Sequence, residues 1–273
     1  MKILATSSLA LMLATCLGAD AVVIKDGESI AFLGDSITYL GNDKPNGYIH
    51  LVIEGLKTAG VNATPIPAGV GGDNTGTMLG RLDKDVIAKK PTWMTLNSGV
   101  NDTSVFTVEE FGANLAKIVD QATAAGIKVI LMNTTISAAE KLDCSDSLKR
   151  LQFCEEFKEL AKKRNLILVN LNTAMTRELI KRRQDGVNGP ILLSDGVHLN
   201  GLGNQIVAAE ILRTLGVSEP DLAALRKRWD NYPFAVAKPI VSVGDYIKLK
   251  ALAEKNGMTI DEQVSEILTA NVK

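Results

Sequence analysis

The sequence predicts an α/β protein with a three-layer α/β/α architecture, in which helices cover both faces of a mainly parallel, doubly wound sheet and a C-terminal helical appendix follows. Short apolar runs alternate with helix-length segments along residues 22–216, and this alternation is typical of parallel strands joined by helical crossovers. Runs such as residues 128–132 are apolar with little alternation, which is typical of strands buried on both faces. From Gly216 onward the pattern is helical only.

The N-terminus has the pattern of a secretory signal peptide. Met1 and Lys2 precede an apolar run that is too short to span a bilayer, and an Ala-x-Ala pattern ends at Ala21. We therefore expect residues 1–21 to be removed and the mature protein to be secreted or periplasmic. Residues 22–216 are expected to form the main domain, with residues 217–273 as a helical extension packed on it.

Each strand is predicted from a short apolar run. Residues 22–24 and 29–33 are separated by Asp26 and Gly27, and an Asp-Gly pair between apolar runs predicts a tight hairpin. Further runs predict strands at residues 61–66, 92–96, 127–132 and 166–169.

The helices are marked by capping residues and by apolar periodicity. Thr107 and Glu110 form a capping box before an apolar face that repeats to Ala122, ahead of Gly126. The C-terminal appendix is expected to contain helices at residues 222–229, 243–256 and 259–271, the last with a second capping box.

Charge and cysteine content exclude several kinds of partner. Thirty basic residues oppose 31 acidic ones, for a net charge of −1, so binding to nucleic acid is not expected. No segment after residue 21 is long and apolar enough for stable membrane insertion. Cys144 and Cys154 lie ten residues apart, and residues 147–163 are predicted to be helical. Ten residues along a helix span about 15 Å, which is too far for a disulfide unless the loop before the helix folds back. The cysteine spacing does not suit zinc, so neither a metal nor a cofactor is expected.

The chain contains few histidines, so few residues are candidates for a general base. The chain has two histidines, His50 and His198. His198 follows Asp195 by three residues in a polar, glycine-containing loop, where a carboxylate can reach Nδ1 and leave Nε2 free. His50 lies in a predicted helix and is interpreted as structural. A surface-loop role for His198 is the ordinary alternative.

A serine and two glycine- or asparagine-rich loops follow three of the predicted strands. Ser36, within residues 34–38, comes directly after the first strand, at the sheet edge where α/β proteins bind ligands. Its ordinary alternative is a helix cap. Residues 69–75 carry Gly71 and Gly72 but lack the last glycine of a dinucleotide fingerprint. Residues 97–103 carry Asn101, whose amide suits an oxyanion donor, although turns favour the same residues.

Taken in order, these blocks resemble the SGNH hydrolases, the family of GDSL-like lipases, acylhydrolases and esterases. The four blocks lie at residues 34–36, 69–72, 99–102 and 195–198, and the similarity covers residues 28–215. The resemblance implies that Ser36 is the nucleophile, that His198 transfers its proton and that Asp195 orients the imidazole. It also implies an oxyanion hole formed by the backbone N–H groups of Ser36 and Gly72 and by the Asn101 amide. Gly71 replaces a serine found in many relatives, so either glycine is a candidate donor, and Gly72 is preferred.

The implied function is that of an exported serine esterase that hydrolyses carboxylic esters through an acyl-serine intermediate. Polar loops beside the predicted site, together with export, favour O-acetyl groups on carbohydrates over other small-molecule esters. A lysophospholipase or short-chain lipid esterase would use the same catalytic set, and a non-catalytic carbohydrate-binding protein on the same fold is an alternative of another class. The acyl chain length and the oligomeric state remain open.

Overall fold

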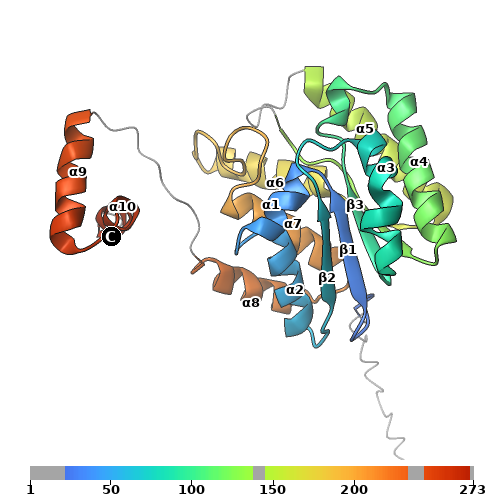
Figure 1. Cartoon of the computed structure of the whole chain (residues 1–273), viewed down its shortest axis with the longest axis horizontal. Coiled ribbons are helices and arrows are strands. Elements are labelled where there is room, and N and C mark those ends of the chain that lie inside the picture. Colours follow the sequence, from blue (N-terminus) through green and yellow to red (C-terminus); the bar gives the residue numbers. More distant parts are fainter. Residues whose placement is uncertain (1–21, 138–144, 233–242, 271–273) are drawn as a thin grey trace, which may run out of the picture.

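A computed structural model describes residues 22–137, 145–232 and 243–270. Its centre is a five-stranded sheet in the order β2-β1-β3-β4-β5, and every neighbouring pair of strands is parallel. Figure 1 shows helices on both sides of this sheet, which gives three layers. The strands are β1 (Ser29–Gly34), β2 (Thr64–Gly69), β3 (Trp93–Asn97), β4 (Lys128–Met132) and β5 (Ile167–Val169). The predicted three-layer parallel fold is confirmed.

Both faces of the sheet are apolar, and successive side chains along each strand point alternately into one of two cores. Phe32 of β1 and Ile130 of β4 point into one core, while Leu33 and Leu131 point into the other. The first core is covered by α1 (Ser36–Asp43), α2 (Tyr48–Thr58), α6 (Leu171–Gln184), α7 (Gly201–Thr214) and α8 (Glu219–Trp229). The second is covered by α3 (Thr75–Asp85), α4 (Val108–Ala124) and α5 (Ser145–Arg164).

The predicted hairpin at the start of the mature chain is wrong. Asp26 and Gly27 do form a turn, in which the Glu28 N–H donates to the Lys25 carbonyl at 3.1 Å, but residues 22–24 form no strand. Strands β2 and β3 occupy both edges of β1, so no edge remains for an antiparallel partner. The Val23 N–H instead donates to the carbonyl of Leu215, just after α7, at 2.9 Å.

Strand β2 lies three residues later than predicted. It pairs with β1 from Thr64 opposite Ser29 to Gly69 opposite Gly34, so both strands end at the same level. Its two prolines, Pro65 and Pro67, are tolerated because β2 is an edge strand. This register brings the glycine loop after β2 beside the loop that carries Ser36.

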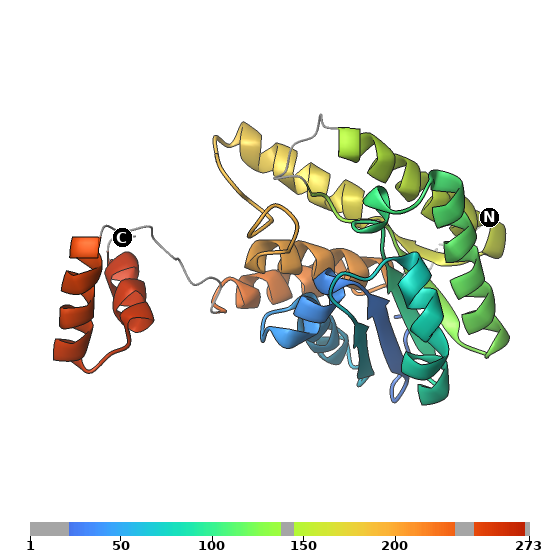
Figure 2. The same cartoon turned by 45° about the horizontal axis from the view of Figure 1, so that its top comes forward.

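The start of the C-terminal extension is attached to the main domain through α8. Trp229 is fully buried, and its Nε1 donates to Glu54 of α2 at 2.9 Å. The hydroxyl of Tyr232 donates to the same carboxylate at 2.8 Å. Helices α9 (Val243–Asn256) and α10 (Ile260–Ala270) contact each other, and Figures 1 and 2 show this pair apart from the sheet. That α9 and α10 pack on the main domain stays a prediction, as do the predicted domain boundaries.

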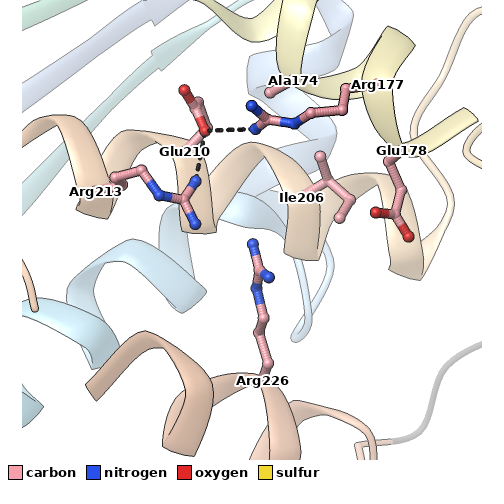
Figure 3. A pocket seen from close by; sticks show the side chains of 7 residues that line it. All are labelled: Ala174, Arg177, Glu178, Ile206, Glu210, Arg213 and Arg226. Carbon is pink, nitrogen blue, oxygen red and sulfur yellow. Dashed lines mark hydrogen bonds and ion pairs between the residues drawn. The ribbon is translucent and has the colours of Figure 1, made fainter. Parts of the chain in front are cut away.

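Helices α6, α7 and α8 surround a hollow of about 360 Å³ (Figure 3). Arg213 donates to Glu210 at 2.6 Å, and Arg177 lies 3.7 Å from the same carboxylate oxygen. The lining residues are Ala174, Arg177, Glu178, Ile206, Glu210, Arg213 and Arg226. None of the predicted site residues is among them, so this hollow is not the space into which Ser36 opens.

Candidate active site

The structure brings Ser36, His198 and Asp195 together, although 162 positions separate the serine from the histidine. The Nε2 atom of His198 lies 2.9 Å from Ser36 Oγ, and its Nδ1 atom lies 2.7 Å from Asp195 Oδ2. A hydroxyl, an imidazole and a carboxylate in this order can activate the hydroxyl as a nucleophile, because the imidazole accepts its proton and the carboxylate stabilises the resulting imidazolium.

The turn after β1 leaves the Ser36 hydroxyl free for this contact. The helix cap of α1 is Asp35, whose buried carboxylate accepts the Ile37 N–H at 2.9 Å. Ser36 is therefore the first residue of α1 and is not its cap. The N–H groups of a first helical turn have no acceptor within the helix, and the positive end of the helix dipole favours an anion at this point.

The loop that carries His198 is closed on itself between α6 and α7. Leu193 and Leu199 form an isolated antiparallel bridge, and the Ser194 N–H donates to the His198 carbonyl at 2.8 Å. Within the loop, Asp195 Oδ1 accepts the N–H groups of Val197 and His198 at 3.0 and 2.8 Å. The other oxygen, Oδ2, is therefore available to the imidazole ring of His198.

The charge state of Asp195 determines the tautomer of His198. Partial burial raises the pKa of Asp195, but hydrogen bonds from the His198 ring and from the two backbone N–H groups outweigh it and lower the pKa to about 2. The carboxylate is thus ionised at neutral pH and can only accept. Nδ1 must then carry the proton of the neutral ring, and Nε2 is the acceptor that faces the Ser36 hydroxyl.

A second network fixes the serine helix relative to the histidine loop. Tyr48, at the start of α2, is buried and donates from its hydroxyl to Thr38 of α1 at 2.9 Å. Its backbone N–H donates to Asn204 of α7 at 2.8 Å. Asn204 Nδ2 in turn donates to the carbonyl of Asn200, which follows the His198 loop, at 2.9 Å. Through Tyr48, α2 therefore links the helix that carries Ser36 to the end of the loop that carries His198.

The glycine loop after β2 lies directly against the serine helix. A Cβ atom on Gly69 would fall 2.3 Å from the backbone nitrogen of Tyr39, so only glycine fits at this approach. Gly72 has a φ of 80°, in the left-handed region that glycine adopts without strain. Among the described residues, the N–H of Gly72 donates to no acceptor. It is therefore available to a ligand.

The asparagine loop after β3 is tied to the glycine loop at two points. Asn101 Nδ2 donates one proton to the Asp73 carbonyl at 2.8 Å, which leaves the second amide proton for another acceptor. The buried Asp102 carboxylate accepts the Thr75 N–H at 2.8 Å and the Gly99 N–H at 3.1 Å. Since β1 lies between β2 and β3, Ser36, Gly72 and Asn101 follow three adjacent strand ends.

Two buried carboxyl groups beside these loops titrate abnormally. Complete burial raises the pKa of Asp35 to about 7, opposed by the Ile37 N–H and assisted by the negative charge of Asp102. Burial also raises the pKa of Asp102, although hydrogen bonds from Thr75 and Gly99 lower it in part. Repulsion between the Asp35 and Asp102 carboxylates disfavours the ionisation of both at once.

Other residues that the sequence singled out lie outside this cluster. His50 is exposed on α2, with Nε2 2.7 Å from the Asn42 carbonyl. Cys154 is buried and free, and burial raises the pKa of its thiol to about 12; Cys144 lies outside the described residues, as does the predicted signal peptide. In the described part of the chain, His, Cys, Asp and Glu side chains form no group of three or more that suits a metal ion, and no helix is long and apolar enough to cross a membrane.

Sequence reasoning missed Arg81 of α3. Its side chain is 15% exposed and donates to Asp73, to Asp85 and to the Gly34 carbonyl. The available signal was its position three residues after Met78, which places a charged side chain at the border of the buried face of α3. A guanidinium at such a position requires acceptors nearby.

Comparison with known proteins places this chain among esterases. Residues 32–206 match the profile of the GDSL-like lipase/acylhydrolase family. An acetylxylan esterase of Geobacillus stearothermophilus is 25% identical over 218 residues, which cover 71% of this chain and 96% of that protein. The esterase TesA of Pseudomonas aeruginosa is 29% identical over 126 residues, which cover 45% of this chain and 63% of TesA.

Solved structures agree in fold. The acetyl xylan esterase AlAXEase has 30% sequence identity and a TM-score of 0.62, and the match covers 68% of this chain and 98% of that one. The acetylxylan esterase Axe2 of Geobacillus stearothermophilus has 24% identity and a TM-score of 0.63, with 72% and 97% covered. Helices α8, α9 and α10 lie beyond the last residue of the family match.

Proposed function

The chain belongs to the GDSL-like lipase/acylhydrolase family and is an ester-hydrolysing enzyme, and from that premise we propose that it is an exported carbohydrate O-acetylesterase that works through an acyl-Ser36 intermediate. The observation that carries the mechanism is the continuous contact from Ser36 through His198 to Asp195, with heavy-atom distances of 2.9 and 2.7 Å.

In the proposed acylation step, Ser36 Oγ attacks the acetyl carbonyl carbon while His198 Nε2 takes the hydroxyl proton. The carbonyl oxygen becomes an oxyanion, which accepts hydrogen bonds from the N–H groups of Ser36 and Gly72 and from the free amide proton of Asn101. The tetrahedral intermediate collapses, the bond to the sugar oxygen breaks, and the imidazolium returns its proton to that oxygen. Water then repeats the sequence on the acyl-serine, which releases acetate and restores Ser36.

Asp195 has two tasks in this scheme. Its Oδ1 atom organises the loop by accepting two backbone N–H groups, and its Oδ2 atom holds the imidazole with Nδ1 protonated. Because its pKa is lowered to about 2, the carboxylate keeps its negative charge and stabilises the imidazolium throughout the working pH range.

Three observations favour acetylated carbohydrate as the substrate. Two of the similar proteins are acetylxylan esterases by name. Ser104 is exposed and Thr103 is half-buried, and these polar residues follow Asn101 closely, so we expect polar groups at the rim of the site. The expected signal peptide directs the enzyme toward extracellular polymers. These features suit a small acyl group on a polar alcohol better than a long-chain lipid.

The mechanism is tested with Ser36→Ala. This variant is expected to lose turnover of p-nitrophenyl acetate and labelling by a fluorophosphonate probe, while its circular dichroism spectrum and Tm stay those of the wild type. Arg177→Gln, a change at an exposed side chain of α6, is the matched control and keeps full activity. Retained turnover in folded Ser36→Ala would remove Ser36 from the mechanism.

The substrate is tested by comparing acyl chains and acetylated glycans. Kcat/KM is expected to fall as the p-nitrophenyl ester lengthens from acetate to octanoate, and acetate release from acetylated xylan should exceed that from acetylated pectin fragments or fatty-acid release from lysophospholipid. A preference for octanoate or lysophospholipid would favour the lipid esterase instead. Mass spectrometry of the secreted protein tests export, with an N-terminus at Val22 as the expected result.

A further inference from the structure

We propose that Arg81 is a positioning residue that holds the glycine loop against the serine turn, so that the N–H groups of Gly72 and Ser36 face one oxyanion. The inference rests on the proposed function and adds a residue that contacts no reacting atom. Its basis is that one guanidinium bonds to both of the loops that supply the backbone donors.

The first contact is with the serine turn. Arg81 Nη2 donates to the carbonyl oxygen of Gly34 at 3.0 Å, and Gly34 is the last residue of β1, two positions before Ser36. The Val70 N–H donates to the same carbonyl at 3.1 Å. Arg81 therefore binds the point at which the serine turn and the glycine loop already touch.

The second contact is with the glycine loop itself. Arg81 Nε donates to Asp73 Oδ2, and Asp73 follows Gly72 directly. The carbonyl of Asp73 accepts the Asn101 amide at 2.8 Å. Through the one residue Asp73, the guanidinium thus holds the backbone beside Gly72 and, indirectly, the orientation of the third oxyanion donor.

The geometry requires an arginine. The side chains of Arg81 and Asp73 are only 15% and 10% exposed, and the third acceptor is Asp85 Oδ2 at 3.1 Å from Nη1. Three acceptors in different directions match the planar fork of a guanidinium, whereas the single nitrogen of a lysine cannot reach all of them. Burial from water strengthens these charge-assisted bonds.

Arg81 is not needed to anchor α3 on the sheet. Met78 and Leu82 of the same helix are fully buried in the core, and the helix begins with a capping box between Asn74 and Thr77. Loss of the guanidinium is therefore expected to leave α3 in place and to release the glycine loop. Because oxyanion donors act on the transition state more than on the bound ester, the loss should appear in kcat more than in KM.

The experiment compares Arg81→Gln and Arg81→Lys with the wild type, with Arg177→Gln as the matched control. Kcat for p-nitrophenyl acetate is expected to fall about 10- to 100-fold in Arg81→Gln and less in Arg81→Lys, with KM changed less than about threefold. A phenylboronic acid, which forms a tetrahedral adduct with a serine nucleophile, should lose affinity by the same factor as kcat/KM. Added guanidinium chloride at low millimolar concentration should restore part of the activity of Arg81→Gln.

A purely structural role gives a different pattern. Equal losses in kcat and in the folded fraction, with boronate affinity per folded molecule unchanged, would overturn the proposal, as would wild-type kcat in Arg81→Gln. Arg81→Lys keeps the charge and so tests the inference even if Arg81→Gln fails to fold. Failure of the proposed function is distinguishable, because it requires that Ser36→Ala remains active, whatever the Arg81 variants do.

Discussion

Replacing Asp195 by asparagine isolates the tautomer of His198 from the shape of its loop. Asp195 Oδ1 accepts two backbone N–H groups, and Oδ2 accepts the ring Nδ1–H. In Asp195→Asn the remaining carbonyl oxygen must stay on the two backbone donors, so the new NH2 group takes the place of Oδ2 and faces Nδ1. A donor there favours the ring with Nδ1 unprotonated, which puts the proton on Nε2 and removes the acceptor from Ser36.

The size of the effect follows from how tightly the site enforces the wrong tautomer. The same change in a buried serine-protease triad costs about 10⁴-fold in kcat. The Asp195 side chain is 55% exposed, so water competes with the new amide for Nδ1 and weakens the constraint. We therefore expect a loss of about 10²- to 10³-fold in kcat, which is about 3–4 kcal/mol in the activation barrier, with little change in KM.

The assay is steady-state hydrolysis of p-nitrophenyl acetate between pH 5 and pH 9, with Asp195→Ala as the comparison. Alanine also removes the acceptor for the loop, yet it leaves Nδ1 free to donate to water. It is expected to lower Tm more than asparagine does and to lower kcat no more than asparagine does. Near-wild-type kcat in Asp195→Asn, or a much slower Asp195→Ala with an intact fold, would refute the assigned division between Oδ1 and Oδ2.

Three further predictions concern the loops around the serine. Asn101→Ala removes the proposed side-chain oxyanion donor and is expected to lower kcat about 100- to 1,000-fold in the same assay. Gly72→Ala is expected to lower Tm and kcat more than Gly71→Ala, because of the two only Gly72 has a positive φ, 80°, where a Cβ atom costs about 1–2 kcal/mol. Burial raises the pKa of Asp35 from 3.8 to about 7, so the folded protein binds an extra proton in that window and its free energy of unfolding falls as the pH rises through it. Asp35→Asn is expected to remove this dependence, which is at most about 3 kcal/mol between pH 5 and pH 8, the two pH values at which urea unfolding is compared.

Elements with local signals were predictable from the sequence. The capping box of Thr107 and Glu110 begins α4 as predicted, and α9 has the predicted bounds Val243–Asn256. The absence of a hairpin at Asp26 was not predictable in this way, because a turn signal reports local backbone geometry and not whether the strand edge is free. Only the strand order, with β1 inside the sheet, decides that.

The site blocks were predictable because parallel strands bring their carboxyl ends to one edge. Ser36, Gly72 and Asn101 each follow a strand, and the order β2-β1-β3 makes these three strands neighbours. Their chemical roles remain predictions, although the distances from Ser36 to His198 and from His198 to Asp195 are those that the resemblance implies. Arg81 follows no strand, and its position on the helix is a weaker signal, since an arginine within an amphipathic helix is ordinarily interpreted as a solvated side chain.

The contacts around Ser36 divide into two networks, one attached to the serine helix α1 and the other to the end of the preceding strand β1. Tyr48 and Asn204 join α1, which carries Ser36, to α7, which follows the His198 loop. Arg81 and Asp73 join the end of β1 to the glycine loop, which carries a proposed oxyanion donor, the N–H of Gly72. Because neither network contains a residue of the other, we expect that substitutions can perturb the proposed base and the proposed oxyanion hole separately.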